Sequence, residues 1–301
     1  MPGLVPGIHV LATSQYGNKK DVDGRDISAF TRVVDALCPA MTNVWNRSQP
    51  KGCPMSSSID EACYALALAN RIVAYEGVLD GFGHISVRHP TNPNHYLLSR
   101  SRSPELVEPS DILEFTLDSK KVTPGDILPY GECVIHGEIY KARPDVNAVC
   151  HHHSPAVLPF CVTGVDLVPV MGLGATMGAV VPFWDSADEF GDTPMVVTTQ
   201  AQGASLARAL GPHAMVLMRR HGATVVGASL QEVVFRSIHT HRNAELLLRA
   251  HALGTVTPLS KGEAEMACAY SLRERPMGRA WEYWVTRLTK AGELPPGMAQ
   301  A

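Results

Sequence analysis

The chain has 301 residues, of which 45% are hydrophobic, and a net charge of −3, as expected for a globular protein with a substantial core. No block of Lys and Arg supplies the basic face of a nucleic-acid surface, and no apolar run is long enough to cross a bilayer. The seven cysteines form no Cys-x-x-Cys pair, and the N-terminus lacks a signal-peptide pattern. These features exclude zinc-finger and thioredoxin-like chemistry. They predict a reduced cytoplasmic protein without membrane or nucleic-acid partners.

The predicted elements alternate between helices and short strands. Residues 1–57 are expected to form an arm with a helix over 27–45, and a capping box at Ser58 and Glu61 opens the next helix. We expect the following helices over 59–76, 131–143, 156–161, 199–210, 230–253, 260–273 and 277–291. We expect strands over 84–88, 95–99, 112–117, 146–153, 167–171, 180–183, 214–218 and 223–226, with an acidic loop over 186–193. Short connections between the early strands favour antiparallel pairing.

The strand over 146–153 ends in three consecutive histidines. Alternation along a strand places His151 and His153 on one face and His152 on the other. Two imidazoles one strand pitch apart can share a metal ion, although a His-x-His pair also occurs by chance. His221 follows a buried strand and precedes a glycine, where a loop can aim its side chain into a cleft. The alternative for His221 is a strand-end histidine bonded to backbone.

Three neutral imidazoles with an open fourth position form the ligand set of a catalytic metal. Glu132 is the fourth candidate, although a glutamate in the first turn of a helix also stabilises the helix dipole without any chemical role. His136 shares a helix face with Glu132, so a supporting contact and simple core packing both remain open.

An ordered set of motifs resembles the class II aldolase/adducin family from about Ser58 to Leu253. The motifs are Glu132-x3-His136, then Arg143-Pro-Asp-Val-Asn-Ala-Val, then His151-x-His153 and finally His221-Gly222. The resemblance implies an α/β fold, a three-layer α/β/α sandwich around a mainly antiparallel sheet. It also implies a homotetramer with sites between subunits. On this basis we expect an N-terminal arm and helix over 1–57, a class II aldolase/adducin-like domain over 58–256 and a C-terminal helical extension over 257–301.

The resemblance also implies a cofactor and site residues. A divalent metal ion, Zn, Mn or Co, is expected on the histidines matching the family ligands, His151, His153 and His221. The family acid, matching Glu132, ligates the empty metal or works as an acid or base.

The chain departs from the family's sugar-phosphate aldolases at positions where those enzymes hold phosphate. It has Gly83-His84-Ile85-Ser86 where they carry Gly-Asn-x-Ser, Arg100-Ser101 where they carry Thr-Gly, and Tyr130-Gly131 in place of a Ser pair. Arg100 and Arg102 offer forked donors suited to a carboxylate, although a solvated arginine is an equal alternative. This combination resembles a family branch that includes decarboxylases of hydroxyaromatic dicarboxylates, such as dihydroxyphthalate or hydroxypyridine dicarboxylate.

The resemblance therefore implies a metal-dependent lyase that decarboxylates a hydroxylated aromatic (di)carboxylate in aromatic catabolism. Substrate contacts are expected at Ser86, Arg100, Ser101 and Arg102, and Glu132 or His84 is expected to donate the proton that replaces carbon dioxide. One alternative is a class II aldolase that cleaves a non-phosphorylated hydroxy-acid. Another is a metal-free adducin-like binding module, and epimerase chemistry is a weaker third.

Overall fold

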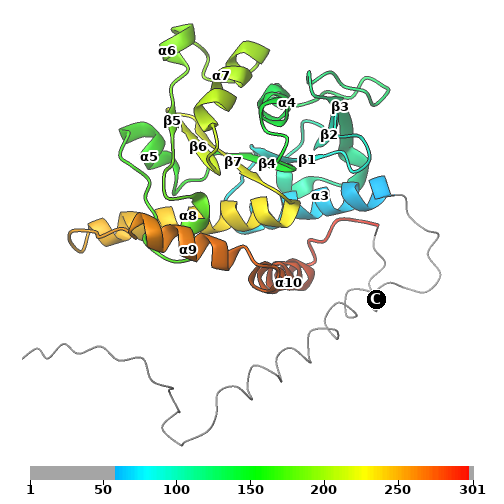
Figure 1. Cartoon of the computed structure of the whole chain (residues 1–301). Coiled ribbons are helices and arrows are strands. Elements are labelled where there is room, and N and C mark those ends of the chain that lie inside the picture. Colours follow the sequence, from blue (N-terminus) through cyan, green and yellow to red (C-terminus); the bar gives the residue numbers. More distant parts are fainter. Residues whose placement is uncertain (1–57, 298–301) are drawn as a thin grey trace, which may run out of the picture. The chain divides into compact units, whose positions relative to one another are not determined.

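The computed structural model describes residues 58–297, and Figure 1 labels its elements. The predicted arm and helix over 1–57, and the capping side chain of Ser58, lie outside the described residues. The helices are α3 (Ser58–Tyr75), α4 (Cys133–Ala142), α5 (Leu158–Thr163), α6 (Ala187–Phe190), α7 (Gln200–Leu210), α8 (Leu230–His251), α9 (Lys261–Ser271) and α10 (Glu274–Ala291). The strands are β1 (His84–Arg88), β2 (His95–Ser99), β3 (Ile112–Thr116), β4 (Ala148–His152), β5 (Phe183–Trp184), β6 (Met215–Met218) and β7 (Gly222–Gly227).

One sheet runs through the centre of the described chain in the order β3-β2-β1-β4-β7-β6-β5. Every neighbouring pair is antiparallel except β5 and β6, which are parallel. The hydrogen-bond register places His84 opposite His151 across β1 and β4, and Thr224 opposite His151 across β4 and β7. The central strand β4 therefore collects residues from both of its neighbours around one histidine.

Helices cover both faces of this sheet (Figure 1). Successive side chains of β4 point to opposite faces of the sheet, and each face has its own apolar core. Ala148 and Cys150 belong to one core, whereas Val149 belongs to the other. The first core includes residues of α3, α8 and α10, and the second includes residues of α4 and α7. The three-layer α/β/α sandwich with a mainly antiparallel sheet is thus confirmed. His151, two residues from Val149, faces the α4 side.

Three short elements differ from the sequence prediction. Residues 167–171 form no strand, because the side-chain amide of Asn243 accepts a hydrogen bond from Val170 N at 2.9 Å and donates one to Val168 O at 2.8 Å. A side chain thus takes the place of a neighbouring strand for these backbone groups. In place of the strand predicted over 180–183 the structure has the two-residue strand β5, which shares only Phe183 with the prediction. The acidic loop predicted over 186–193 contains the short helix α6.

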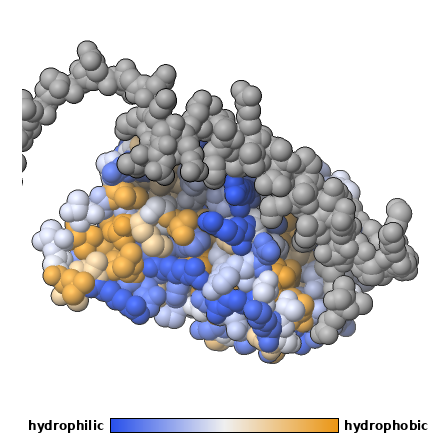
Figure 2. Space-filling view, turned by 90° about the horizontal axis from the view of Figure 1, so that it is seen from below, coloured by the Kyte–Doolittle hydropathy of each residue, from blue (hydrophilic) through white to orange (hydrophobic). Residues whose placement is uncertain are grey.

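The C-terminal helices α9 and α10 correspond to the last two predicted helices. Trp281, Trp284 and Leu288 of α10 are buried in the same core as α3 and α8. Figure 2, which views the molecule from below, shows apolar patches between polar side chains. Met266 and Tyr270 of α9 are exposed. None of the helices between residues 58 and 297 has the length and apolar character needed to cross a membrane.

Candidate metal centre

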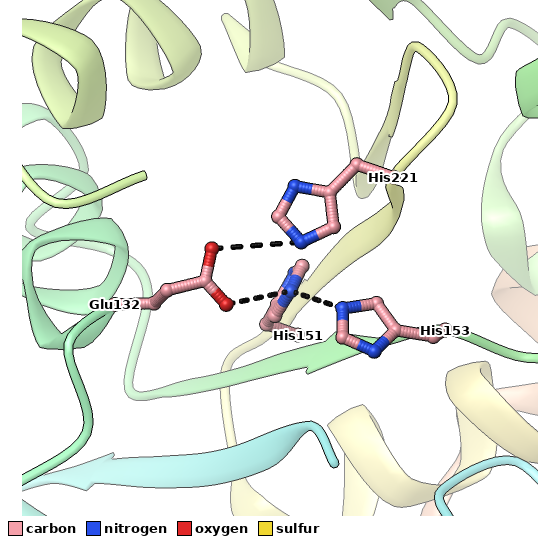
Figure 3. A group of neighbouring side chains, drawn as sticks. All are labelled: Glu132, His151, His153 and His221. Carbon is pink, nitrogen blue, oxygen red and sulfur yellow. Dashed lines mark hydrogen bonds and ion pairs between the residues drawn. The ribbon is translucent and has the colours of Figure 1, made fainter. Parts of the chain in front are cut away.

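Four side chains from three parts of the sheet and its helices point toward one another in Figure 3: Glu132, His151, His153 and His221. Glu132 is the N-cap residue of α4, and His151 lies near the end of β4. His153 directly follows that strand, and His221 lies in the turn between β6 and β7. The structure therefore brings together all three predicted metal ligands and the predicted acid.

The distances within this group are short. The Nε2 atoms of His151 and His153 lie 3.0 Å apart. Glu132 Oε2 lies 3.5 Å from His151 Nε2, and Glu132 Oε1 lies 3.5 Å from His221 Nε2. One potential ligand atom from each of the four residues lies within 4.8 Å of all the others. The carboxylate is held in place from the far side, because Val197 N donates to Glu132 Oε1 at 3.0 Å.

The turn that carries His221 depends on close backbone packing. Arg220 has a φ of 54°, and His221 N donates to Met218 O at 3.1 Å. A Cβ atom at Gly222 would lie 2.3 Å from His152 O and 2.8 Å from His153 Cδ2. Only glycine therefore lets β7 approach β4 closely enough to place His221 beside the other two imidazoles.

The hydroxyl of Thr224 lies beside Nδ1 of His151. The Thr224 hydroxyl donates to Met218 Sδ at 3.4 Å, and its oxygen lies 3.3 Å from His151 Nδ1. With its hydrogen given to Met218, the Thr224 oxygen can accept a hydrogen bond from Nδ1–H of His151. In that tautomer the Nε2 atom of His151 directs a lone pair toward the group. This is how a hydrogen bond behind a histidine prepares it to bind a metal.

The electrostatics also favour neutral imidazoles beside an ionised carboxylate. Burial, together with the charge that the His151 ring would carry, lowers the pKa of His153 to about 4 and that of His221 to about 3. Burial by itself would raise the pKa of Glu132, but the charge that the His151 and His221 rings would carry, and a hydrogen bond from His151, lower this pKa below its ordinary value. Glu132 is therefore ionised at neutral pH, which suits a ligand or a base better than a proton donor.

The donor set fits a divalent cation. Two ligands bound at about 2.1 Å in a tetrahedral arrangement lie about 3.4 Å apart, close to the separations found here. Three imidazole nitrogens and one carboxylate match the ligands that Zn²⁺ and related ions take in catalytic sites.

His152 points away from this group, as strand alternation predicts. It is fully buried, and its Nδ1 accepts a hydrogen bond from Ser154 N at 3.3 Å. Its Nε2 atom is buried without a partner among the described residues.

His84 lies beside the four candidate ligands Glu132, His151, His153 and His221, which we call the metal-ligand group. Its ring centroid is 5.3 Å from that of His151 and 4.4 Å from that of Tyr130. Its Nδ1 atom is 2.7 Å from Nε2 of His136, which is fully buried behind it. Ser86, predicted to contact substrate, is also fully buried, and its hydroxyl lies between His136 and Tyr140. Its predicted contact with substrate would therefore have to displace one of these partners.

Tyr130 was not predicted as a site residue, although it stands where the sugar-phosphate aldolases carry a Ser pair. Its ring stacks at an angle on His84, and its hydroxyl donates to Arg102 O. The departure from the family pattern at Tyr130 was the signal that could have identified it.

The predicted carboxylate-binding arginines are both held by Asp111. Arg100 Nε donates to Asp111 Oδ1 at 2.6 Å, and Arg102 Nη1 donates to Asp111 Oδ2 at 2.6 Å. Arg102 also contacts Glu108 at 3.5 Å. Ser101 lies between them, exposed, with its N–H donated to Leu128 O. The two guanidinium groups are thus fixed together, and the role of these residues in binding substrate stays a prediction.

The chain is similar to known proteins over most of its length. Residues 64–248 match the class II aldolase and adducin N-terminal domain. The chain is 33% identical to the decarboxylase tropJ of Talaromyces stipitatus over 237 residues, which cover 71% of this chain and 89% of that protein. It is 31% identical to the 3,4-dihydroxyphthalate decarboxylase of Arthrobacter keyseri, over 63% of this chain and 79% of the relative.

Solved structures show the same fold. The L-fuculose 1-phosphate aldolase of Glaciozyma antarctica superposes with a TM-score of 0.66 at 23% identity, covering 80% of this chain and 96% of the other. An aldolase II superfamily protein from Pseudomonas syringae superposes with a TM-score of 0.68 at 19% identity, with the same coverage of both chains.

Proposed function

The chain belongs to the class II aldolase and adducin family, and we propose that it is a metal-dependent lyase that decarboxylates a hydroxylated aromatic carboxylate. The observation that carries the proposal is the convergence of three imidazoles and one carboxylate at metal-ligand spacing. Decarboxylation is preferred to aldol cleavage because two relatives of the chain, the decarboxylase tropJ and a 3,4-dihydroxyphthalate decarboxylase, are decarboxylases by name. The proposed substrate class is a dihydroxyphthalate or a hydroxypyridine dicarboxylate, as used in aromatic catabolism.

In this proposal His151, His153 and His221 hold a divalent ion, Zn, Mn or Co. Such an ion supplies Lewis acidity, which stabilises the negative charge left when a carbon–carbon bond breaks. The chain itself prepares the ligands: Thr224 orients His151, and burial keeps His153 and His221 neutral.

Glu132 is the proposed carrier of the proton. Because it is ionised beside the histidines, it is placed to take a proton from the ring hydroxyl of the substrate. It then returns this proton to the ring carbon, where the electron pair of the broken bond remains after carbon dioxide leaves. His84, on the same side of the group, is the second candidate for contact with the reacting atoms. Arg100 and Arg102, fixed by Asp111, are the proposed partners of the second carboxylate.

We also propose that the protein works in the cytoplasm as a homo-oligomer, a tetramer by analogy with its family. The cysteines of the described part are all free thiols, which supports a reducing compartment.

The test uses the full chain, stripped with a chelator and reloaded separately with Zn²⁺, Mn²⁺ and Co²⁺. Metal content and carbon dioxide release from 3,4-dihydroxyphthalate are measured together, with aldehyde and ketone release from non-phosphorylated hydroxy-acids in parallel. Phthalate, which lacks the hydroxyls, is the matched control substrate. We expect carbon dioxide release only from the metal-loaded protein, and only from 3,4-dihydroxyphthalate, which carries the ring hydroxyls that phthalate lacks. Aldehyde release alone would identify an aldolase, and failure to bind any of the three metals would refute the proposal in favour of a binding module.

A further inference from the structure

A chain of hydrogen bonds runs from the interior of the protein to His84. Tyr140 OH lies 2.8 Å from Ser86 Oγ, which lies 2.6 Å from His136 Nδ1. His136 Nε2 lies 2.7 Å from His84 Nδ1. Tyr140 and His136 come from α4, and Ser86 and His84 come from β1, so the chain crosses from helix to sheet twice. It ends on His84, whose ring centroid lies 5.3 Å from that of His151.

Burial determines the direction of this chain. Tyr140, Ser86 and His136 are at most 1% exposed, so water reaches none of their polar atoms. Within the described residues the Tyr140 hydroxyl has two hydrogen-bond partners, Ser86 Oγ and the backbone of Val149, and of these only Ser86 Oγ can accept the phenol hydrogen, because a backbone N–H only donates. The phenol hydrogen therefore points to Ser86, because a buried hydroxyl hydrogen without an acceptor is strongly disfavoured.

The remaining hydrogens follow in order. Ser86 accepts from Tyr140, so its own hydrogen goes to His136 Nδ1, its other partner. Burial lowers the pKa of His136 to about 3, so the ring is neutral and carries its single hydrogen on Nε2. That hydrogen is donated to His84 Nδ1. Because Nδ1 of His84 accepts this hydrogen, it carries none of its own, and the hydrogen of the His84 ring lies on Nε2.

The free edge of His84 faces the site. Its Nε2 atom makes no hydrogen bond within the described residues, yet it is absent from the set of polar atoms that are buried without a partner. The ring contacts both Tyr130 and His151, one of the candidate metal ligands. The hydrogen on Nε2 is therefore open to whatever occupies that space.

We propose that Tyr140, Ser86 and His136 are positioning residues that hold His84 with its hydrogen on Nε2, as a donor to an anionic oxygen of the substrate. The oxygen is that of a carboxylate or a phenolate, and His84 binds it without giving up the hydrogen. The substrate part of this inference rests on the proposed function, whereas the hydrogen position on His84 is a property of the protein alone.

The test is nitrogen-15 NMR of the metal-free full chain labelled at histidine, with the His84 signal assigned by its loss in His84→Asn. We expect a protonated Nε2 and an unprotonated, hydrogen-bonded Nδ1. His136→Gln keeps one donor for His84 and one acceptor for Ser86, so it should preserve this pattern, whereas His136→Leu should mix the two tautomers. The matched control for Ser86→Ala is Ser205→Ala, which removes a buried hydroxyl that contacts Trp184 and Glu189 instead.

Kinetics of the metal-loaded enzyme complete the test. Ser86→Ala and His136→Leu should raise KM for the aromatic carboxylate by roughly tenfold, as for loss of a hydrogen bond to a charged group, while His136→Gln restores it. A wild-type His84 protonated on Nδ1 would overturn the inference even in an active enzyme. A protonated Nε2 in an enzyme that releases no carbon dioxide would support the relay and overturn the proposed function.

Discussion

Replacing Thr224 by valine tests whether the hydroxyl behind His151 prepares the metal ligand. Valine keeps the shape of the side chain but removes the only acceptor for His151 Nδ1–H among the described residues. In the metal-free variant the ring can move its hydrogen to Nε2, which lies 3.5 Å from the Glu132 carboxylate. Metal binding must then reverse that change, so affinity falls.

The structure also sets the size of the effect. Hydrogen bonds behind a metal-ligating histidine contribute about 10- to 100-fold in affinity. The Oγ1–Nδ1 distance of 3.3 Å is long for a hydrogen bond, so we expect the lower end. A loss of about tenfold corresponds to about 1.4 kcal/mol, close to the contribution of one neutral hydrogen bond.

The assay is competition between the protein and a chelator of known affinity for Zn²⁺, monitored at constant pH. The matched control is Thr240→Val, because Thr240 is also fully buried and, among the described residues, its hydroxyl hydrogen-bonds only to a methionine sulfur, Met215 Sδ at 4.0 Å. Circular dichroism and the unfolding midpoint show that both variants are folded. Equal affinities for wild type and Thr224→Val, or an equal loss in both variants, would refute the reasoning.

Three further predictions concern the same region. Gly222→Ala should destabilise the fold by about 1–3 kcal/mol in urea unfolding, because its Cβ meets backbone at 2.3 Å, whereas Gly262→Ala, in open space on α9, should be neutral or slightly stabilising. His153→Ala should reduce bound metal from about one ion per chain to near zero by elemental analysis, while His152→Ala, on the opposite face, should keep it. Burial by itself would raise the pKa of Asp111, but the bonded Arg100 and Arg102 lower it below its ordinary value. The ionised carboxylate therefore stabilises the fold fully at a pH above the ordinary pKa, and this stabilisation disappears as the pH falls through the lowered pKa. Asp111→Asn should therefore lose about 1–3 kcal/mol at pH 7 and less at pH 3; an equal loss at both would contradict this.

Several features of the site follow from local sequence. The two-residue period of a strand predicts that His151 and His153 share a face and that His152 points away, and the structure has this arrangement. Helical and strand periodicity likewise predicted the main elements within a few residues, because these patterns reflect which side of a local element is buried.

Other features depend on contacts between residues far apart in the chain. The register of β4 and β7 brings Thr224 opposite His151, and packing of α4 on β1 joins His136 to Ser86. The amide of Asn243 replaced a predicted strand partner by bonding the backbone near residue 168. No local period encodes such contacts, because they arise when whole elements pack and buried polar groups must all find partners. The sequence by itself thus determined the types of the candidate ligands and the faces on which they lie. Only the tertiary structure decided which hydrogen bonds orient them.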